Sequence, residues 1–260
     1  MIRILVLGDV LSPATVAFLE RRLWAFRREN AVDFTVVNGE NGSFLSGIGP
    51  KDAERLLAAG ADCITGGNHT VATKSVFPLL ESSDRVLRPL NLPDAVPGAG
   101  YTILPVRDRK ILVLSALGCL FMDAGTPDPV PQIERILERE RGRYDLSILD
   151  LHAEATGEKL TMAHRLDGKL SAVFGTHTHV PTADECVLPK GTGYISDVGF
   201  SGRSGGVLGV ATEVMTERQR TRLRVSYAEA SGPFEGQGAL FDLDETSGKT
   251  LAVRRIVVRE

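Results

Sequence analysis

The segment Ile2-Arg3-Ile4-Leu5-Val6-Leu7-Gly8-Asp9 is an apolar run that ends in a glycine and an acid. A run of this kind predicts a strand that is buried on both faces. Pro13 then opens a helical pattern, and residues 33–37 and 61–65 predict two further strands on either side of a second helix at 49–60. Strand, helix, strand, helix and strand in this order predict a parallel sheet built from βαβ units.

The rest of the chain continues this alternation and ends in strands. Its middle predicts a hairpin, then helix, strand, helix and strand, over residues 101–106 with 111–115, 131–141, 146–151, 155–166 and 172–174. Its last third predicts antiparallel strands at 223–230, 238–243 and 251–258, with a turn at 245–248. Because no linker or repeat interrupts the chain, we expect one domain over residues 1–260. We expect a four-layer α/β/β/α sandwich of two mixed sheets flanked by helices, the first sheet mostly parallel and the second more antiparallel.

Composition limits which classes of protein this chain can belong to. The chain has 260 residues, 43% of them hydrophobic, and a formal net charge of -3. It contains no apolar run of about eighteen residues, and its first residues are too few and too acidic for a signal peptide, so we expect no membrane span. Three cysteines without Cys-x-x-Cys spacing are typical of a reducing compartment, which predicts a cytoplasmic protein. The arginines within 218–224 favour a solvated helix end and strand edge over a nucleic-acid patch.

Polar side chains follow each of the early predicted strands, at the edge where open α/β folds place their sites. They are Asp9, Glu40 with Asn41, Asn68 with His69, His152, and His177 with His179. The last pair lies in Gly175-Thr176-His177-Thr178-His179-Val180-Pro181-Thr182-Ala183-Asp184, where we expect Gly175 to end the strand and let the backbone turn. Gly8, Gly39 and Gly67 are expected to keep the backbone permissive at the equivalent places.

Each of these residues also has an ordinary structural explanation. Asp9 and Asn68 are suited to cap helices, residues 38–41 to form a turn, and His152 to lie in the core. Together these explanations require five coincidences, so a metal site is favoured. Oxygen and nitrogen donors without thiolate suit Fe, Mn or Zn. Six to eight candidates suit two ions that share a bridging carboxylate, about 3.5–4 Å apart, an arrangement that clamps a phosphoryl group and lowers the pKa of a shared water.

The same residues resemble the calcineurin-like metallophosphoesterases. That superfamily has Gly-Asp after the first strand, a bridging acid after the second, Gly-Asn-His after the third, a lone histidine and then Gly-His-x-His. This chain reads Gly8-Asp9, Gly39-Glu40-Asn41, Gly67-Asn68-His69, His152 and Gly175-Thr176-His177-Thr178-His179. It is more similar still to the bacterial YmdB-type subgroup, at residues 38–41, 67–70, 152–156 with Glu158-Lys159, and 175–184. The resemblance extends from residue 1 to about 258 and implies that superfamily's fold and phosphoester hydrolysis.

The chain departs from the motifs of the superfamily and the subgroup at two places. The superfamily has Asp-x-His in its first motif, whereas this chain reads Asp9-Val10-Leu11, and the subgroup resemblance implies that Asn41 takes the place of the missing ligand. The chain also has Leu11-Ser12-Pro13 and Val71-Ala72-Thr73 where the subgroup usually has more glycine and a Trp-Asp pair. These differences touch the rim of the site, so they bear on substrate preference more than on metal binding.

Our hypothesis from this resemblance is a dinuclear site. It assigns one ion to Asp9, Glu40, Asn41 and His179 and the other to Glu40, Asn68, His152 and His177, with the Glu40 carboxylate bridging. His177 and His179 would serve different ions because alternate residues of an extended loop face opposite ways. A metal-bound hydroxide would attack phosphorus in line, and His69 would act near the leaving oxygen as general acid or transition-state donor. Fe and Mn are the expected metals, with Zn as the alternative.

The implied substrates are phosphodiesters, first of all 2′,3′- and 3′,5′-cyclic nucleotides, and we expect a homo-oligomer. Three alternatives stay open. A phosphomonoesterase or nucleotidase would use the same ions and water. A regulatory, RNA-associated binding protein with a vestigial site would have no reason to retain every ligand. A dinuclear amide hydrolase on another fold would not explain the Gly-Asn-His turn.

Overall fold

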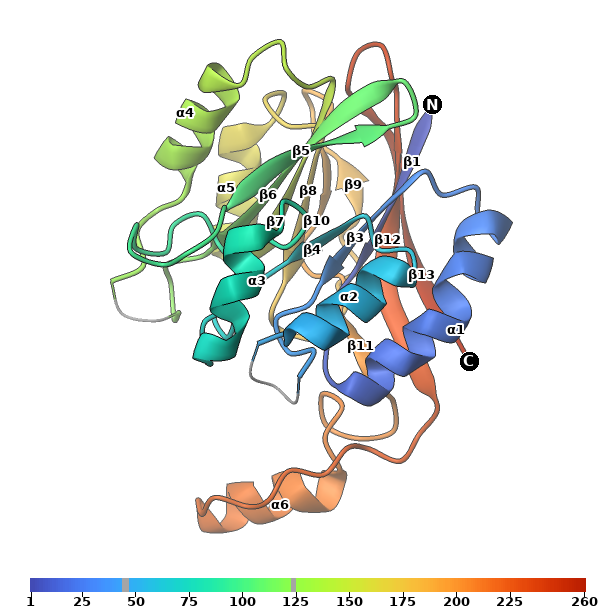
Figure 1. Cartoon of the computed structure of the whole chain (residues 1–260), viewed down its shortest axis with the longest axis vertical. Helices are drawn as coiled ribbons and strands as arrows, with labels where there is room; N and C mark the ends of the chain where they lie inside the picture. The colour runs from blue at the N-terminus through green and yellow to red at the C-terminus, as the bar shows by residue number, and fades with distance from the viewer. Residues whose placement is uncertain (44–46, 123–124) are drawn as a thin grey trace.

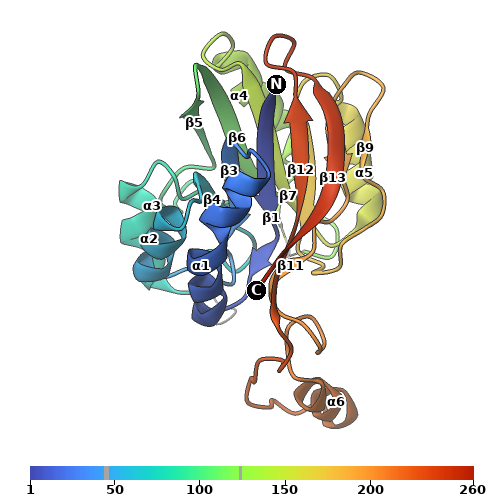
Figure 2. The ribbon, with the colours of Figure 1, turned by 90° about the vertical axis from the view of Figure 1, so that its right-hand side faces the viewer.

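Two sheets face each other at the centre of the molecule, and helices cover both outer sides (Figures 1 and 2). The structure is a computed structural model that describes residues 1–43, 47–122 and 125–260. The predicted four-layer α/β/β/α sandwich is confirmed. None of the helices in the described ranges has the length and apolar character that a membrane crossing requires.

The first sheet combines strands from both ends of the chain. In spatial order it contains β2 (Asp9–Val10), β11 (Phe200–Arg203), β12 (Phe234–Leu243), β1 (Ile2–Leu7), β3 (Phe34–Asn38) and β4 (Cys63–Thr65), and β13 (Thr250–Arg259) also pairs with β12. Strands β1, β3 and β4 are parallel neighbours, which confirms the predicted βαβ start. Strand β12 is antiparallel to β1, β11 and β13.

The middle of the chain forms the second sheet. Its spatial order is β5 (Tyr101–Val106), β6 (Arg109–Leu117), β7 (Leu146–His152), β8 (Ala172–Thr176), β10 (Gly193–Ile195) and β9 (Cys186–Val187). Neighbours from β6 to β10 are parallel, and β5 and β9 are antiparallel edges. The expected contrast between a parallel first sheet and an antiparallel second sheet is therefore wrong, because the antiparallel C-terminal strands join the first sheet.

Helices cover the outer face of each sheet. The first sheet packs against α1 (Pro13–Glu29), α2 (Pro50–Ala58) and α3 (Phe77–Ser82), which follows the 3-10 turn η1 (Lys74–Val76); the second packs against α4 (Val130–Arg139) and α5 (Thr156–Leu166). Helix α1 begins at Pro13 because Ser12 caps it, with Oγ accepting from the Thr15 N–H at 3.2 Å. Pro13 has a fixed φ that suits a helix. It also lacks the backbone N–H, which would have no partner in the first turn of the helix.

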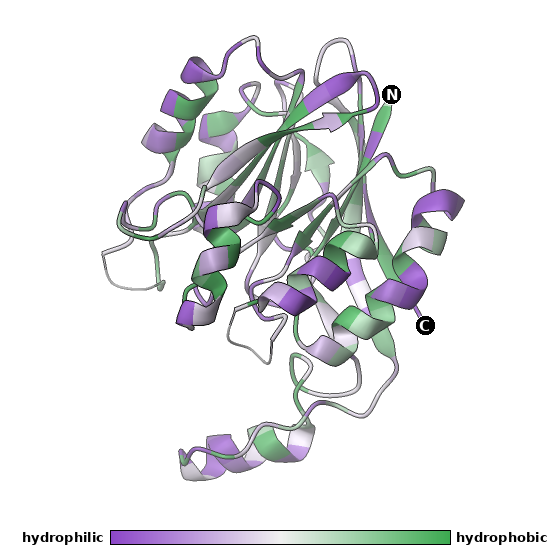
Figure 3. Cartoon of the chain, viewed as in Figure 1, coloured by the Kyte–Doolittle hydropathy of each residue, from purple (hydrophilic) through white to green (hydrophobic). Residues whose placement is uncertain are grey.

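Alternation along the strands explains why four layers form. Ile2, Ile4 and Val6 of β1 lie in the core between the sheets, whereas Leu5 and Leu7 lie in the core under the helices. Figure 3 shows the strands of both sheets mainly in the hydrophobic colour. A strand that is apolar on both faces needs cover on both faces, so a second sheet on one side and helices on the other satisfy it.

Two local predictions are wrong. Residues 223–230, all within the described chain, form no strand; an isolated bridge at Glu229 is their one pairing. They follow α6 (Thr212–Thr221), whose last turn holds Arg218 and Arg220, so the expected helix end is present and the expected strand edge is not. In addition, Gly175 does not end its strand, because β8 continues through it to Thr176.

Candidate metal centre

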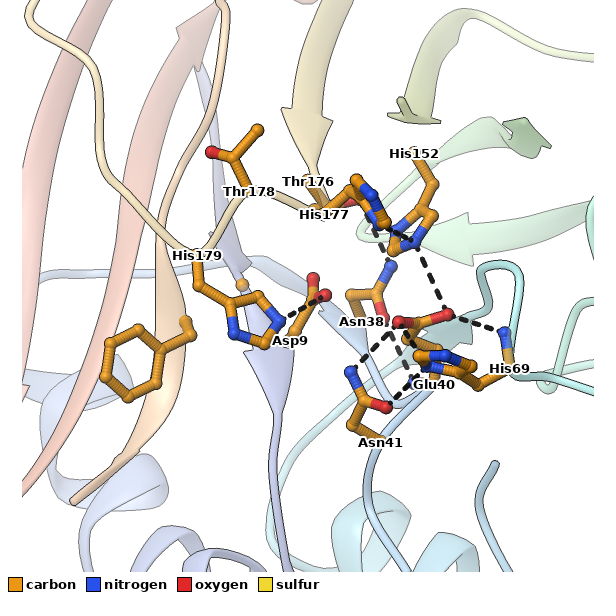
Figure 4. A network of polar contacts seen from close by, with 12 residues as sticks. Asp9, Asn38, Glu40, Asn41, His69, His152, Thr176, His177, Thr178 and His179 are labelled. Atoms are coloured by element: carbon orange, nitrogen blue, oxygen red, sulfur yellow. Dashed lines mark hydrogen bonds and ion pairs between the residues drawn. The ribbon is translucent and has the colours of Figure 1, made fainter. Parts of the chain in front are cut away.

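The predicted site residues converge from the carboxyl ends of strands in both sheets (Figure 4). The first sheet supplies Asp9 at the start of β2, Glu40 and Asn41 after β3, and Asn68 and His69 after β4; the second supplies His152 at the end of β7, and His177 and His179 after β8. Each sheet thus contributes one half of the cluster. The first half is mainly carboxylate and amide, and the second half is imidazole.

His152 lies at the centre of one group of donors. Its side chain is fully buried, and its Nε2 lies 2.9 Å from Asn68 Oδ1, 3.1 Å from His177 Nδ1 and 3.4 Å from Glu40 Oε2. Ligand atoms of Glu40, His152 and His177 all lie within 4.8 Å of one another. The structure therefore brings together the four residues that the sequence assigns to the second ion.

Hydrogen bonds fix the proton positions on both histidines of this group. Thr176 Oγ1 donates to Asp150 Oδ1 at 2.7 Å, so it accepts from His152 Nδ1 at 2.9 Å. Glu154 Oε2 lies 3.1 Å from His177 Nε2 and accepts its proton. In this tautomer, the lone pairs of His152 Nε2 and His177 Nδ1, 3.1 Å apart, would be directed at the same point. Burial holds the pKa of His152 well below its usual value, so the ring is neutral and able to bind a metal.

These acceptor atoms fit a metal ion. Four acceptors converge on one point, an arrangement that a cation stabilises and that hydrogen bonds among them cannot. Donor atoms bound to one ion at about 2.0–2.2 Å lie about 3 Å apart, which is the spacing around His152 Nε2. Gly67 provides the room, since a Cβ there would overlap Glu40 Oε2 and lie 2.5 Å from His152 Nε2.

Asp9 and His179 form a second group. His179 Nε2 lies 3.1 Å from Asp9 Oδ2, and the Asp9 side chain is fully buried. Asp9 Oδ1 and His179 Nδ1 are buried without a hydrogen-bond partner among the described residues. Burial alone would lower the pKa of His179, but the hydrogen bond and charge of Asp9 outweigh it and raise the pKa. A buried carboxylate oxygen without a partner is costly, and a bound cation would satisfy it.

Glu40 connects the donors around it. Its side chain is buried; Oε2 faces His152 and accepts from the His69 backbone N–H at 3.0 Å, and Oε1 accepts from Asn41 Nδ2 at 2.9 Å. His69 Nδ1 lies 2.9 Å from Asn41 Oδ1. Asn41 thus contacts Glu40 and His69, and no hydrogen bond within the described ranges joins it to Asp9.

The chain matches the family model described as YmdB-like protein over residues 5–256. It belongs to the YmdB-like family. The match covers both sheets and every predicted site residue. The predicted family, the calcineurin-like phosphoesterase fold and the enzyme class of metallophosphoesterase are thereby confirmed.

Relatives of this YmdB-like chain share its full length. It is 35% identical over 258 residues to a Bacillus subtilis (strain 168) protein named 2′,3′-cyclic-nucleotide 2′-phosphodiesterase, covering 99% of this chain and 97% of that protein. A solved structure of a hypothetical protein from Thermus thermophilus has a TM-score of 0.92 and 36% identity over 100% of both chains. Another, described as a novel phosphatase from Mycoplasma pneumoniae, has a TM-score of 0.90 and 30% identity over 100% of this chain and 94% of that one.

The loop of the YmdB-like chain that carries His177 and His179 turns without glycine. Both histidines have positive φ, 98° and 62°, a region that side chains rarely adopt. The two rings do point to different groups of donors (Figure 4), but the expected reasons, a turn at Gly175 and alternation along an extended loop, are wrong. Strain of this kind persists only where the surrounding structure imposes it.

A buried ion pair next to the loop holds the strained backbone of His177 and His179 in place. Lys159 of α5 donates from Nζ to Asp197 Oδ2 and to the Thr176 carbonyl, each at 2.8 Å. Asp197 Oδ2 also accepts from the Thr178 N–H at 3.1 Å and from its Oγ1 at 2.9 Å. The side chains of Lys159 and Asp197 are 2% and 1% exposed. The pair therefore fixes the residue before His177 and the residue after it.

Replacing Lys159 by Met is expected to lower the free energy of unfolding by about 3–5 kcal/mol, because Asp197 would keep a buried charge without its partner. Urea unfolding followed by circular dichroism would measure the change. Lys169→Met is the matched control, since its pair with Glu134 is solvent-exposed and worth about 1 kcal/mol or less. Equal losses in the two variants would contradict the structural role of Lys159.

The sequence missed the buried residues that support the ligands. Asp150 accepts from Thr176 Oγ1 at 2.7 Å and from Asn38 Nδ2 at 2.9 Å, and burial raises its pKa to about 7. Asn38 Oδ1 accepts from the Glu40 N–H at 3.0 Å. Asp150 precedes His152 by two residues on β7, so both side chains lie on the same face of the strand. The two-residue spacing between Asp150 and His152 is the sequence pattern that could have indicated the role of Asp150.

Proposed function

We propose that this YmdB-like enzyme hydrolyses phosphodiesters at a dinuclear metal site and that its first substrates are 2′,3′- and 3′,5′-cyclic nucleotides. The observation that carries the proposal is the convergence of three acceptors on His152 Nε2, itself a fourth, together with the separate Asp9–His179 pair. The name of the Bacillus subtilis relative supports the cyclic-nucleotide class.

The two groups of donors suggest how the ions would be held. One ion would take the unpartnered Oδ1 of Asp9 with His179, Glu40 and Asn41. The other would take His152, His177, Asn68 and Glu40, and the Glu40 carboxylate would bridge. Oxygen and nitrogen donors of this kind suit Fe or Mn, with Zn as the alternative.

Bound ions would supply a deprotonated water at neutral pH and neutralise charge on the phosphoryl oxygens. The chain's own residues position these groups. Glu40 is fixed from both sides, by the His69 N–H on Oε2 and by Asn41 Nδ2 on Oε1. The His69 side chain is 43% exposed, so it lies where a substrate can reach it, and we assign it proton donation to the leaving oxygen.

His69→Ala is expected to keep the metal content of the enzyme and to lower turnover by about 10²–10⁴-fold, the range for loss of a general acid. Metal content would be measured by inductively coupled plasma mass spectrometry and turnover on a chromogenic diester. His164→Ala is the matched control, because His164 is exposed on α5 and contributes to neither group. Loss of metal together with activity in His69→Ala would instead place His69 among the residues that hold the ligands.

A phosphomonoesterase is the second candidate, because the Mycoplasma pneumoniae relative is described as a phosphatase. Turnover of bis-p-nitrophenyl phosphate, p-nitrophenyl phosphate and a panel of cyclic nucleotides with Mn²⁺ would separate the two. We expect the diester and the cyclic nucleotides to be hydrolysed faster. Preference for the monoester would favour the second candidate. No hydrolysis with Mn²⁺, together with no transition metal in the purified protein, would favour a regulatory RNA-associated protein.

A further inference from the structure

A cavity of about 450 Å³ lies between α4 and the chain segment that leads into β5. This volume is in the range of small-molecule pockets. None of the described residues that line the cavity is acidic, and none belongs to the metal centre. The polar residues of its lining are Arg88, Tyr101, Gln132, Arg135 and Arg139. The cavity is therefore a separate part of the protein, and its charge is positive.

Helix α4 contributes two of the three arginines. Gln132, Arg135 and Arg139 are spaced by three and four residues, so they lie along one face of the helix. Arg135 and Arg139 are one turn apart, and like charges at this spacing destabilise a helix. Arg139 pairs with Glu140 at 3.1 Å, whereas Arg135 is exposed and forms no ion pair with a described residue. An anion near both arginines would offset their repulsion.

Arg88 lines the same cavity, and no described carboxylate forms an ion pair with it. The residue is only 9% exposed. Its Nη1 donates to the carbonyls of Pro89 and Leu90 at 2.9 and 3.3 Å, and its buried Nε has no hydrogen-bond partner among the described residues. Burial lowers the pKa of Arg88, and the charge of the exposed Asp94 raises it to a smaller extent. Because arginine keeps its proton inside proteins, the buried charge is costly, and an anion in the cavity would offset that cost.

Three arginines favour a phosphate monoester over other anions. A phosphate monoester carries a charge of about −1.5 to −2 at neutral pH and three acceptor oxygens. Guanidinium groups bind such oxygens through paired N–H donors. A carboxylate or a phosphate diester has a single charge, so it would neutralise the three arginines less well. The volume of the cavity leaves room for the organic part of a small ligand.

We propose that this cavity is a second binding site, which takes a small phosphate monoester and holds its phosphate with Arg88, Arg135 and Arg139. Tyr101 and Gln132 would contact the rest of the ligand. The proposal does not depend on the reaction at the metal centre, because the two sites share no residue.

Isothermal titration calorimetry of the full chain with phenylphosphonate would test the proposal. Phenylphosphonate imitates a phosphate monoester and has no ester bond to hydrolyse. Metal ions at the other site would also bind it, so the Mn²⁺-loaded wild type is titrated in parallel with Glu40→Gln, a variant designed to lose those ions. We expect Glu40→Gln to retain one bound phenylphosphonate per chain.

Arg135→Gln in the Glu40→Gln background is expected to weaken this binding by about 10–100-fold, because it removes a charged hydrogen-bond donor. Arg28→Gln in the same background provides the comparison, since Arg28 is exposed on α1 and lies outside the cavity. Arg88→Met should lose the binding as well. If Arg88→Met does not fold, the substitution at the exposed Arg135 still decides the question.

The proposal would be overturned by any of three results. They are no binding by Glu40→Gln, equal affinities in the Arg135→Gln and Arg28→Gln variants, and an affinity for benzoate that equals the affinity for phenylphosphonate. Retention of a single-stranded RNA oligonucleotide that requires Arg135, without binding of phenylphosphonate, would overturn it in favour of a nucleic-acid site.

Discussion

Glu40→Gln is expected to lower turnover by more than about 100-fold, which exceeds the 10–100-fold loss typical of residues that only support a ligand. Glu40 presents one oxygen to His152 and the other to Asn41, and both are buried. An amide at this position would carry no charge, and its NH₂ group would point a donor into one side of the cluster. The expected result is loss of bound metal together with loss of rate.

Turnover on a chromogenic diester and metal content per chain would be measured in parallel. Glu138→Gln is the matched control, because the Glu138 side chain is 69% exposed and, among the described residues, forms its ion pair with Arg141 on the surface. It should behave as the wild type. Near-normal turnover of Glu40→Gln with two ions still bound would refute the bridging role.

Gly67→Ala is expected to abolish metal binding while the fold stays intact. The added methyl group would overlap Glu40 Oε2 and lie 2.5 Å from His152 Nε2, in the space that the donors surround. The backbone of Gly67 is not in the left-handed region, so alanine imposes no conformational strain there. The substitution therefore fills the centre and changes little else.

Isothermal titration with Mn²⁺, thermal unfolding and diester turnover would test this expectation. Gly157→Ala is the matched control, because a Cβ at Gly157 meets no atom within 4 Å and the residue lies in the first turn of α5. Its binding and turnover should match the wild type, and its stability should rise slightly, since alanine favours helix. Normal metal affinity in Gly67→Ala would show that the ions lie elsewhere.

The fold could be predicted where periodicity is unambiguous. The apolar run of β1 and the apolar spacing of α1 are local properties, so the βαβ start is correct. The pairing of β12 with β1 joins residues about 240 positions apart, and no local pattern encodes it. The strand expected at 223–230 is wrong because an alternating pattern does not supply a neighbouring strand; among the described residues, the one pairing of this segment is the isolated bridge at Glu229.

The convergence of the candidate site residues could be predicted because these polar residues follow strands at short, regular distances. Its support could not, because Asp150, Lys159 and Asp197 are buried polar residues whose partners come from other elements. The role predicted for the glycines is wrong. Gly8, Gly39 and Gly67 do not have positive φ; instead, the neighbouring atoms leave no space for a side chain. The room for a side chain at each glycine depends on residues that are distant in sequence, so a local sequence pattern does not reveal it.

The division of the centre between the two sheets has a mechanical consequence. Asp9 and Glu40 are carried by the first sheet, and His152 and His179 are carried by the second. Ions held by residues of both halves would cross-link the two sheets. Their binding free energy would then oppose sliding of one sheet over the other. The converse would also hold: a substitution deep in the core between the sheets, far from any ligand, would alter how the two halves of the site face each other.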